Sequence, residues 1–258
     1  SQWQARSKYT ATASLCNTSG TLAKIARILG KTEDAAKYKE LSRKVADAYC
    51  SVLTDGNGKT KEEFQTAYVL PLYLNMFPEN VKAKAAENLV KLVEKNDYKI
   101  GTGFPGTPYI LFALADNGHA DTAYKMLLNT QCPSWLYEVK MGATTIWERW
   151  NSIRPDGSFN PANMNSLNHY AYGSIGNWLY TKLCGLEILE SGYKKFALRP
   201  QFIKGITHAE LTYESVYGKI AIAWRCEGGK ITVDATIPAN TTAELTLPEQ
   251  TETLTLGS

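Results

Sequence analysis

The densest group of chemically active side chains lies between Gly142 and Asn151, in the sequence GATTIWERWN. Glu148 stands between Trp147 and Trp150, with an arginine beside it. Indole faces pack against the C–H faces of a sugar ring, and a carboxylate can act as a general base or a nucleophile. These residue types favour a carbohydrate site. The alternative is a structural Trp pair with a surface Glu–Arg pair, because buried Trp is usually structural.

Two further aromatic and polar clusters flank this segment. Trp135 precedes it in SWLY, and His169 follows it in NHYAYG. A histidine near the start of a helix can donate a hydrogen bond to a sugar hydroxyl, although a lone histidine is more often a structural residue. The chain is also rich in aromatic residues, at 11%, with fifteen Tyr and six Trp. This composition favours a ligand with flat apolar faces, such as a sugar.

The segment from Gly101 to Gly106, GTGFPG, matches the dinucleotide fingerprint GxGxxG by letter. That fingerprint requires a hydrophobic strand before it and a helix directly after it. Here the preceding residues 93–98 are polar and Pro105 stiffens the segment, so we predict a tight loop between two helices and no cofactor. The five cysteines and three histidines are scattered. Their spacing predicts neither a disulfide framework nor a metal site.

The chain of 258 residues carries 28 Lys and Arg against 25 Asp and Glu, a net charge of +3. This charge is too small to indicate nucleic acid or an anionic membrane surface as a partner. No apolar run reaches the roughly 18 residues of a membrane span, and the first residues lack the apolar core of a signal peptide. Scattered cysteines favour a reducing cytoplasm, while a secreted or periplasmic parent protein stays open.

Helical periodicity dominates the first 190 residues. Leu41, Val45, Ala48 and Val52 fall on one face of a helix capped at Thr32, and a second such pattern runs from Val81 to Leu92. Further helices are expected at about 9–29, 65–77, 106–117, 119–130 and 167–188. We predict that these helices pair as antiparallel hairpins and that the chain is almost wholly helical up to about residue 190.

After Gly192 the hydrophobic pattern changes to a period of two, which is typical of half-buried strands. Short strands are predicted at 207–213, 219–224, 231–233, 242–247 and 251–256. Strands this short and this closely spaced favour an antiparallel β-sandwich. The predicted organisation is therefore a helical domain at 1–190 followed by a small antiparallel β-sandwich domain at 191–258.

Two stretches together resemble a known family. Residues 101–159, which contain TTIWERW, and residues 164–180, which contain NHYAYG, closely resemble the C-terminal half of bacterial α-L-rhamnosidases of glycoside hydrolase family 78. The segment GYKKFALRPQ, residues 192–201, resembles the entry into the C-terminal β-sandwich of that family. The resemblance implies an (α/α)6 toroid, a six-hairpin barrel, and inverting hydrolysis of terminal α-L-rhamnose from glycosides or oligosaccharides.

The resemblance also implies roles for the residues singled out above. Glu148 matches the general base of the family, and Trp135 and His169 match positions that contact the sugar. Trp147 and Trp150 match positions that shape the pocket. We therefore expect Trp135, Trp147, Trp150 and His169 to meet Glu148 at one concavity.

The chain departs from the family pattern at several positions. The general acid of the family lies in an upstream Asp-Glu-Arg-type motif, which does not occur before the helix predicted at 65–77. Residues 1–3 read Ser-Gln-Trp where the family often has Gly-Asp-Trp, and Glu138 and Asn151 replace Pro and Asp. About seven helices are predicted where the toroid needs twelve. We expect a fragment of a longer enzyme that lacks the general acid, and an uncovered apolar helical face that can form a homodimer.

Two other functions compete with this interpretation. One is a non-catalytic carbohydrate-binding or interaction protein that keeps the aromatic residues without the acid. The other is a different α/α-toroid enzyme, such as a glucoamylase-like or uronyl hydrolase, which requires a pair of catalytic carboxylates elsewhere on the helices. The sequence contains no convincing pair of that kind.

Overall fold

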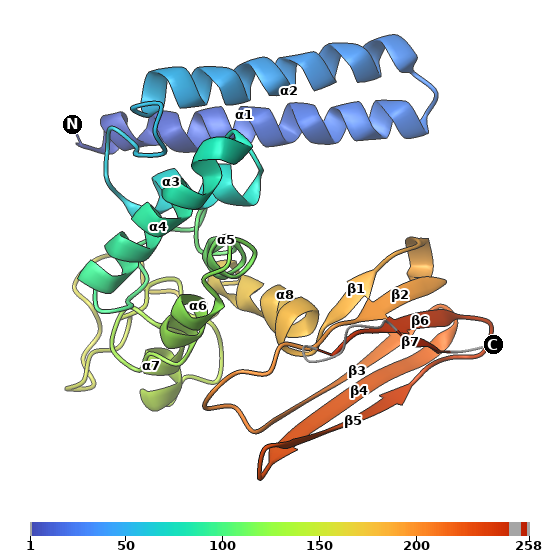
Figure 1. Ribbon diagram of the computed structural model, residues 1–258. Helices are drawn as coiled ribbons and strands as arrows, with labels where there is room; N and C mark the ends of the chain where they lie inside the picture. Colours follow the sequence, from blue (N-terminus) through green and yellow to red (C-terminus); the bar gives the residue numbers. More distant parts are fainter. Residues whose placement is uncertain (1, 248–253, 257–258) are drawn as a thin grey trace. The chain divides into compact units, whose positions relative to one another are not determined.

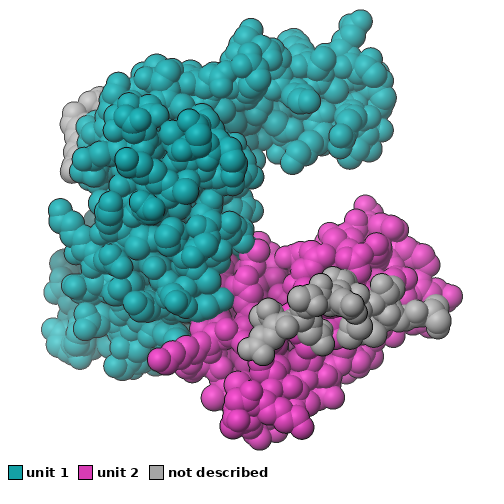
Figure 2. All heavy atoms as spheres, in the orientation of Figure 1, with its two compact units in different colours: residues 1–173 teal, residues 174–258 magenta. Residues whose placement is uncertain are grey.

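The computed structural model describes residues 2–247 and 254–256. The chain divides into two compact units, Ser1–Gly173 and Ser174–Ser258, coloured separately in Figure 2. The first unit is built of helices and long loops, and the second of strands preceded by short helices (Figure 1).

A long antiparallel hairpin begins the first unit, formed by α1 (Gln2–Ile28) and α2 (Thr32–Leu53) (Figure 1). Both helices are confirmed, although α1 begins about seven residues earlier than the predicted 9. Thr32 is the first residue of α2 and not its cap, because Lys31 occupies the cap position. Tyr9, Val45 and Tyr49 lie in the shared core of the hairpin, so an apolar stripe on each helix stabilises the pair.

Helix α3 (Gln65–Tyr73) is buried from Gln65 through Leu72, and the amphipathic α4 (Glu79–Lys95) follows it. Pro71 lies inside α3 and has no N–H to donate to the Ala67 carbonyl. That carbonyl instead accepts a hydrogen bond of 2.6 Å from the Tyr49 hydroxyl of α2. The helix ends at Tyr73, four residues before the predicted end at 77.

Three short helices complete the regular part of this unit: α5 (Ile110–Ala115), α6 (Ala120–Leu127) and α7 (Trp135–Lys140). The segment 101–106 is a loop between α4 and α5, as predicted from its polar flank and Pro105. Its glycines allow a close approach to α3. A Cβ atom on Gly106 would lie 2.8 Å from Thr66 Oγ1.

The expectation of an almost wholly helical chain up to residue 190 is wrong for residues 141–170, which form turns and loops. This segment contains Pro155 and Pro161, and its Asp and Asn side chains accept hydrogen bonds from nearby backbone N–H groups, as Asp156 does from Ser158 at 3.0 Å. Both features compete with helix formation. The helix predicted at 167–188 is likewise replaced by η1 (Ala171–Ser174), α8 (Ile175–Trp178), η2 (Leu179–Leu183) and the strand β1 (Leu186–Ile188).

The described strands of the second unit form a four-stranded sheet, in the order β1-β2-β6-β7, and a three-stranded sheet, β3-β4-β5. After β1, these strands are β2 (Lys195–Leu198), β3 (His208–Ser215), β4 (Gly218–Glu227), β5 (Lys230–Thr236), β6 (Thr242–Leu245) and β7 (Leu254–Leu256). Phe196 of one sheet and Ile222 of the other share a core, which makes a sandwich. The predicted strand at 251–256 is described from 254; residues 251–253 lie outside the described residues.

One strand pair differs from the predicted antiparallel arrangement. β2 and β6 pair in parallel, with Phe196 opposite Ala243, whereas the other pairs of the two sheets are antiparallel. A parallel pair needs a long crossover, and here β3, β4 and β5 supply it. The hydrophobic period of two cannot distinguish these arrangements, because it reports only which side chains face the core.

Helix α1 also carries an exposed apolar stripe. Leu15, Leu22 and Ile25 are exposed on its surface, near the exposed Ile28 and Leu29. Within the part of the chain that the structure describes, no helix is both long enough and apolar enough to cross a membrane.

Candidate functional site

Helix α7 holds three irregular segments with three of its side chains. The Trp135 indole N–H donates to the Tyr172 carbonyl at 2.9 Å, and the Tyr137 hydroxyl donates to the Ile153 carbonyl at 3.1 Å. The Glu138 carboxyl accepts the Trp147 N–H at 3.4 Å through Oε2. At the start of the helix, the Ser134 hydroxyl accepts the Tyr137 N–H at 3.1 Å. This short helix therefore positions loops that have little regular structure of their own.

Glu148 is fixed by a second segment, residues 166–169. Its backbone N–H donates to the Ser166 carbonyl at 2.9 Å, and its Oε2 accepts the Ser166 N–H at 3.1 Å. Two residues before Glu148, the Ile146 carbonyl accepts the His169 N–H at 2.8 Å. These bonds bring the segments that carry Glu148 and His169 side by side.

The tryptophans of the cluster are packed against other rings. Trp150 stacks on Tyr172 with ring centroids 3.9 Å apart, and Trp135 meets Trp150 edge to face at 5.5 Å. Trp135 and Trp150 are each 7% exposed and Trp147 is 2% exposed. Much of the aromatic surface thus stabilises the site from within.

A cavity of about 550 Å³ opens beside Glu148. Of the predicted site residues, Glu148 and Trp150 line it, together with Phe104, Cys132, Pro133, Arg149, Asn151, Met164 and Tyr172. The size lies within the usual range of small-molecule sites. His169 lies one ring away, because its imidazole stacks on Phe104 at 5.0 Å. Trp135 and Trp147 are outside this lining.

Sequence reasoning did not assign a role to Phe104, Tyr172 or Met164. Phe104 lies at the centre of the segment GTGFPG, where its ring contacts both His169 and Tyr172. An aromatic residue inside a glycine-rich loop was the available signal. Tyr172 was visible in NHYAYG, but its stacking on Trp150 depends on the fold.

Burial raises the pKa of several groups that line the cavity or lie close to it. Burial raises the pKa of Glu138 to about 7, although the Trp147 N–H acts in the opposite direction. Burial also raises the pKa of the Cys132 thiol and of the Tyr172 phenol. The Arg149 Nε atom is buried and has no hydrogen-bond partner among the described residues. The site thus combines a carboxylate, a cation and an aromatic wall, which suits a neutral polar ligand with apolar faces.

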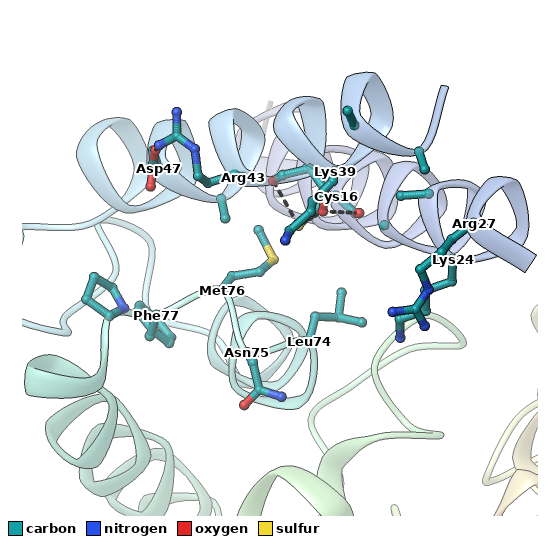
Figure 3. Close-up of a pocket in the computed structure, with 17 residues that line it drawn as sticks. Cys16, Lys24, Arg27, Lys39, Arg43, Asp47, Leu74, Asn75, Met76 and Phe77 are labelled. Atoms are coloured by element: carbon teal, nitrogen blue, oxygen red, sulfur yellow. Dashed lines mark hydrogen bonds and ion pairs between the residues drawn. The ribbon is translucent and has the colours of Figure 1, made fainter. Parts of the chain in front are cut away.

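A larger cavity, of about 780 Å³, lies between α1, α2 and residues 74–78 (Figure 3). Small side chains such as Gly20 and Ala23 line it, and so do several basic ones. Its one acidic residue, Asp47, forms an ion pair with Arg43 at 2.6 Å. None of the predicted site residues lines this larger cavity, whereas Glu148 and Trp150 line the smaller one.

Comparison with known families matches nearly the whole chain. Residues 2–183 match the family described as the bacterial alpha-L-rhamnosidase 6 hairpin glycosidase domain, and residues 185–257 match the bacterial alpha-L-rhamnosidase C-terminal domain. The chain is 40% identical over 238 residues to an alpha-L-rhamnosidase of Streptomyces avermitilis and 39% identical over 239 residues to one of Formosa agariphila. It spans 23% and 26% of the lengths of these relatives, with 92% of this chain covered in each case.

Comparison with solved structures identifies the same family. The native alpha-L-rhamnosidase of Aspergillus terreus superimposes with a TM-score of 0.91 at 38% identity, over 95% of this chain and 29% of the other. The Streptomyces avermitilis enzyme complexed with L-rhamnose gives a TM-score of 0.86 at 40% identity, over 91% of this chain and 23% of the other. The chain therefore belongs to the bacterial alpha-L-rhamnosidase family, from whose six-hairpin and C-terminal domains its two parts derive.

Proposed function

We propose that the chain is the part of an inverting α-L-rhamnosidase that carries the general base, Glu148. One observation carries the proposal: the Glu148 carboxylate lies at a cavity of about 550 Å³ and its Oε2 is held by the Ser166 N–H. The other carboxylate oxygen can then take a proton from water. Aromatic walls formed by Trp150 and Tyr172 keep competing solvent from that water.

Inverting hydrolysis needs two carboxyl groups, about 6.5–9.5 Å apart across the scissile bond. The base activates a water molecule on one face of the sugar, while the acid protonates the leaving oxygen on the other. We place the acid in a part of the enzyme outside these 258 residues. The absence of the Asp-Glu-Arg motif before residue 65 and the 23% coverage of a relative support this placement.

The proposed substrate is a glycoside or oligosaccharide that ends in α-L-rhamnose. Support comes from the Streptomyces avermitilis relative, whose structure holds L-rhamnose. Rhamnose is a 6-deoxy sugar, so its methyl group and C–H face suit the wall of Trp150 and Tyr172. His169 would bind a hydroxyl. Trp135, which the resemblance matches to a sugar contact, lies outside the lining of the cavity and would instead, like Trp147, shape the pocket. The exposed stripe of α1 is the proposed homodimer face.

Replacing Glu148 with Gln in the full-length enzyme tests the proposal. The amide keeps the shape of the side chain but cannot accept the water proton, so kcat on an aryl α-L-rhamnoside should fall about 10²–10⁴-fold with KM changed far less. Glu87→Gln is the matched control, because Glu87 is exposed on α4. Equal activity of the Glu148 variant and this control would contradict the role of Glu148. Rhamnose binding without turnover in the wild-type full-length protein would favour a carbohydrate-binding protein instead.

A further inference from the structure

A small cavity of about 260 Å³ lies in the second unit and shares no lining residue with the cavity at Glu148. It is formed by α8, η2, β1 and the short helix η3 (Ser191–Tyr193), all of which belong to the unit Ser174–Ser258. Its lining consists of Gly176, Asn177, Tyr180, Thr181, Leu186 and Tyr193. The proposed mechanism uses none of these residues.

The side chains of this lining suit an uncharged ligand that has both apolar faces and hydroxyl groups. None of the lining residues is charged, so nothing in the lining neutralises an anion or a cation. Two tyrosine rings come from different elements: Tyr180 of η2 is 45% exposed, and Tyr193 of η3 is half-buried. Such rings pack against the C–H faces of a sugar, and an amide such as that of Asn177 both donates to and accepts from hydroxyl groups. The lining therefore has the residue types that bind a sugar ring.

The polar groups of the cavity are available to a ligand. The Asn177 side-chain amide and the Tyr180 hydroxyl form no hydrogen bond with another described residue. The Thr181 hydroxyl donates to the Asn177 carbonyl at 2.8 Å, and its oxygen can still accept a hydrogen bond. A sugar hydroxyl, which both donates and accepts, thus finds donors and acceptors at this cavity.

An unusual helical turn carries two of the lining residues. The Cys184 N–H donates to the Leu179 carbonyl at 2.9 Å, five residues back, which makes η2 a turn of π-helix. Turns of this kind are rare and are frequently found at functional sites. Tyr180 and Thr181 lie within the turn, and Asn177 lies on α8 directly before it. The π-turn therefore belongs to the wall that presents these three side chains to the cavity.

The opposite wall is also held in an unusual conformation. Tyr193 has a φ of 65°, directly after Gly192 with a φ of 75°. A side chain disfavours this left-handed region, and residues held there cluster at ligand sites. The Tyr193 ring is kept in place by Tyr213, with centroids 4.7 Å apart, and by Phe196 at 6.4 Å. The ring is thus fixed before any ligand binds, which lowers the entropic cost of binding.

We propose that this cavity is a second carbohydrate-binding site, which takes one neutral sugar ring on the C-terminal unit. The volume of about 260 Å³ lies just below the range of sites for drug-sized ligands, so it suits a single ring. The ring packs between Tyr180 and Tyr193, and its hydroxyls bind Asn177 and Thr181. This site does not depend on the role of Glu148. In a longer carbohydrate chain, one unit bound here keeps the rest of the chain at a raised local concentration.

Binding is measured by ¹H–¹⁵N NMR on the 258-residue chain, with L-rhamnose, D-glucose and D-galactose as separate probes. The signals followed are the side-chain amide of Asn177 and the backbone amide of Thr181. We expect both signals to shift and to saturate with at least one of the three sugars, at a dissociation constant on the order of millimolar. No saturable shift with any of the three sugars would overturn the proposal.

Two variants show whether the cavity itself binds the sugar. A Cβ atom on Gly176 would meet no atom within 4 Å, so Gly176→Leu extends into the cavity without a clash, and leucine is the better helix former. This variant should abolish the shift of the Thr181 signal. Tyr180→Ala removes one stacking ring and should weaken binding about two- to tenfold. Binding as tight as that of the wild type in both variants would refute the site.

Tyr217→Ala is the matched control. Tyr217 lies on the same unit and is 41% exposed, close to the exposure of Tyr180, but it is outside the lining. The control should bind the sugar as tightly as the wild type. A loss in Tyr217→Ala equal to that in Tyr180→Ala would show that the effect does not come from the cavity, and would contradict the proposal.

This proposal and the proposed function fail separately. Glu148→Gln should leave the shift of the Thr181 signal unchanged, because the two cavities share no residue. If that shift saturates and Glu148→Gln keeps full turnover in the full-length enzyme, the proposed function is refuted and the second site stands. If Glu148→Gln removes turnover and the Thr181 signal does not shift with any of the sugars, Glu148 stands as the base and the second site is refuted.

Discussion

The Glu148 carboxylate owes its fixed position to a backbone group, the N–H of Ser166. A backbone donor does not rotate away as a side chain can, so it keeps Oε2 in place and leaves the other oxygen for water. The same segment forms a second hydrogen bond with the chain near Glu148, because the His169 N–H donates to the Ile146 carbonyl. Residue chemistry explains why Glu148 stood out in the sequence, whereas this anchoring depends on two segments that meet only in the fold.

Removing the anchoring N–H tests this arrangement. Ser166→Pro lacks the N–H, whereas Ser166→Ala keeps it, so the two variants separate the backbone donor from the side chain. A hydrogen bond to a charged group contributes about 1.5–3 kcal/mol, so the proline variant of the full-length enzyme should lose about ten- to hundredfold in kcat. The alanine variant should lose much less. Equal losses in both would show that the N–H does not position the base.

The raised pKa of Glu138 also predicts a pH-dependent stability. The folded chain holds its proton up to about pH 7, whereas an unfolded Glu titrates near its ordinary value of 4.5. This stabilisation of the neutral form is fully present below about pH 4.5 and is lost as the pH rises to about 7. The free energy of unfolding should fall by roughly 3 kcal/mol at most across this range, relative to Glu138→Gln. Urea denaturation of both chains at pH 4.5 and 8 measures the difference, and parallel curves would contradict the burial argument.

At the scale of elements, α7 shows what sequence periodicity cannot reveal. Its six residues are too few for a hydrophobic pattern, yet its side chains hold residues 147, 153 and 172. The long helix α2 was predictable from its apolar period, but its buried face was predicted only in part. Val45 is buried, together with Tyr49 and Leu53, whereas Leu41, Ala48 and Val52 of the predicted face are exposed. The burial of Glu138 was not predictable, since it arises from contacts between segments far apart in the sequence.

Helix α3 provides a prediction at this scale. The Tyr49 hydroxyl satisfies the Ala67 carbonyl that Pro71 leaves without a helical partner. Tyr49→Phe should leave this buried carbonyl unpaired and lower the free energy of unfolding by about 1–2 kcal/mol. Tyr38→Phe is the control, because Tyr38 lies on α2, as Tyr49 does, and is partly exposed. Chemical denaturation followed by far-UV circular dichroism compares the variants, and a Tyr49 effect no larger than the control would refute this account of α3.

At the scale of the whole molecule, the change from helices to strands was predictable because the hydrophobic period changes from 3.6 to two near Gly192. The parallel pairing of β2 with β6 was not, because both arrangements bury the same faces. The motifs TTIWERW and NHYAYG indicated the family before any fold was known. The irregular course of residues 141–170 between those motifs could not be inferred from them.

The exposed stripe of α1 gives a prediction about assembly. Leu22 and Ile25 are exposed apolar residues on one helix, and burying them against a second copy would remove apolar surface from water. We expect the 258-residue chain to self-associate and the double variant Leu22→Glu, Ile25→Glu to be monomeric. Leu128→Glu places a charge on another exposed leucine and should leave the association unchanged. Light scattering coupled to size-exclusion chromatography measures the molar mass of each variant, and a monomeric wild type would contradict the proposed dimer.

The central claim is that Glu148 activates the attacking water, and the stereochemistry of an azide product tests it most directly. In the full-length enzyme, Glu148→Ala removes the base and leaves room for azide, an anion that needs no base. With an aryl α-L-rhamnoside and azide, ¹H NMR should show a glycosyl azide of β configuration, because the nucleophile attacks the face opposite the leaving group. An α-configured azide, or turnover of Glu148→Ala equal to that of the wild type without azide, would contradict the assignment of Glu148 as the water-activating base.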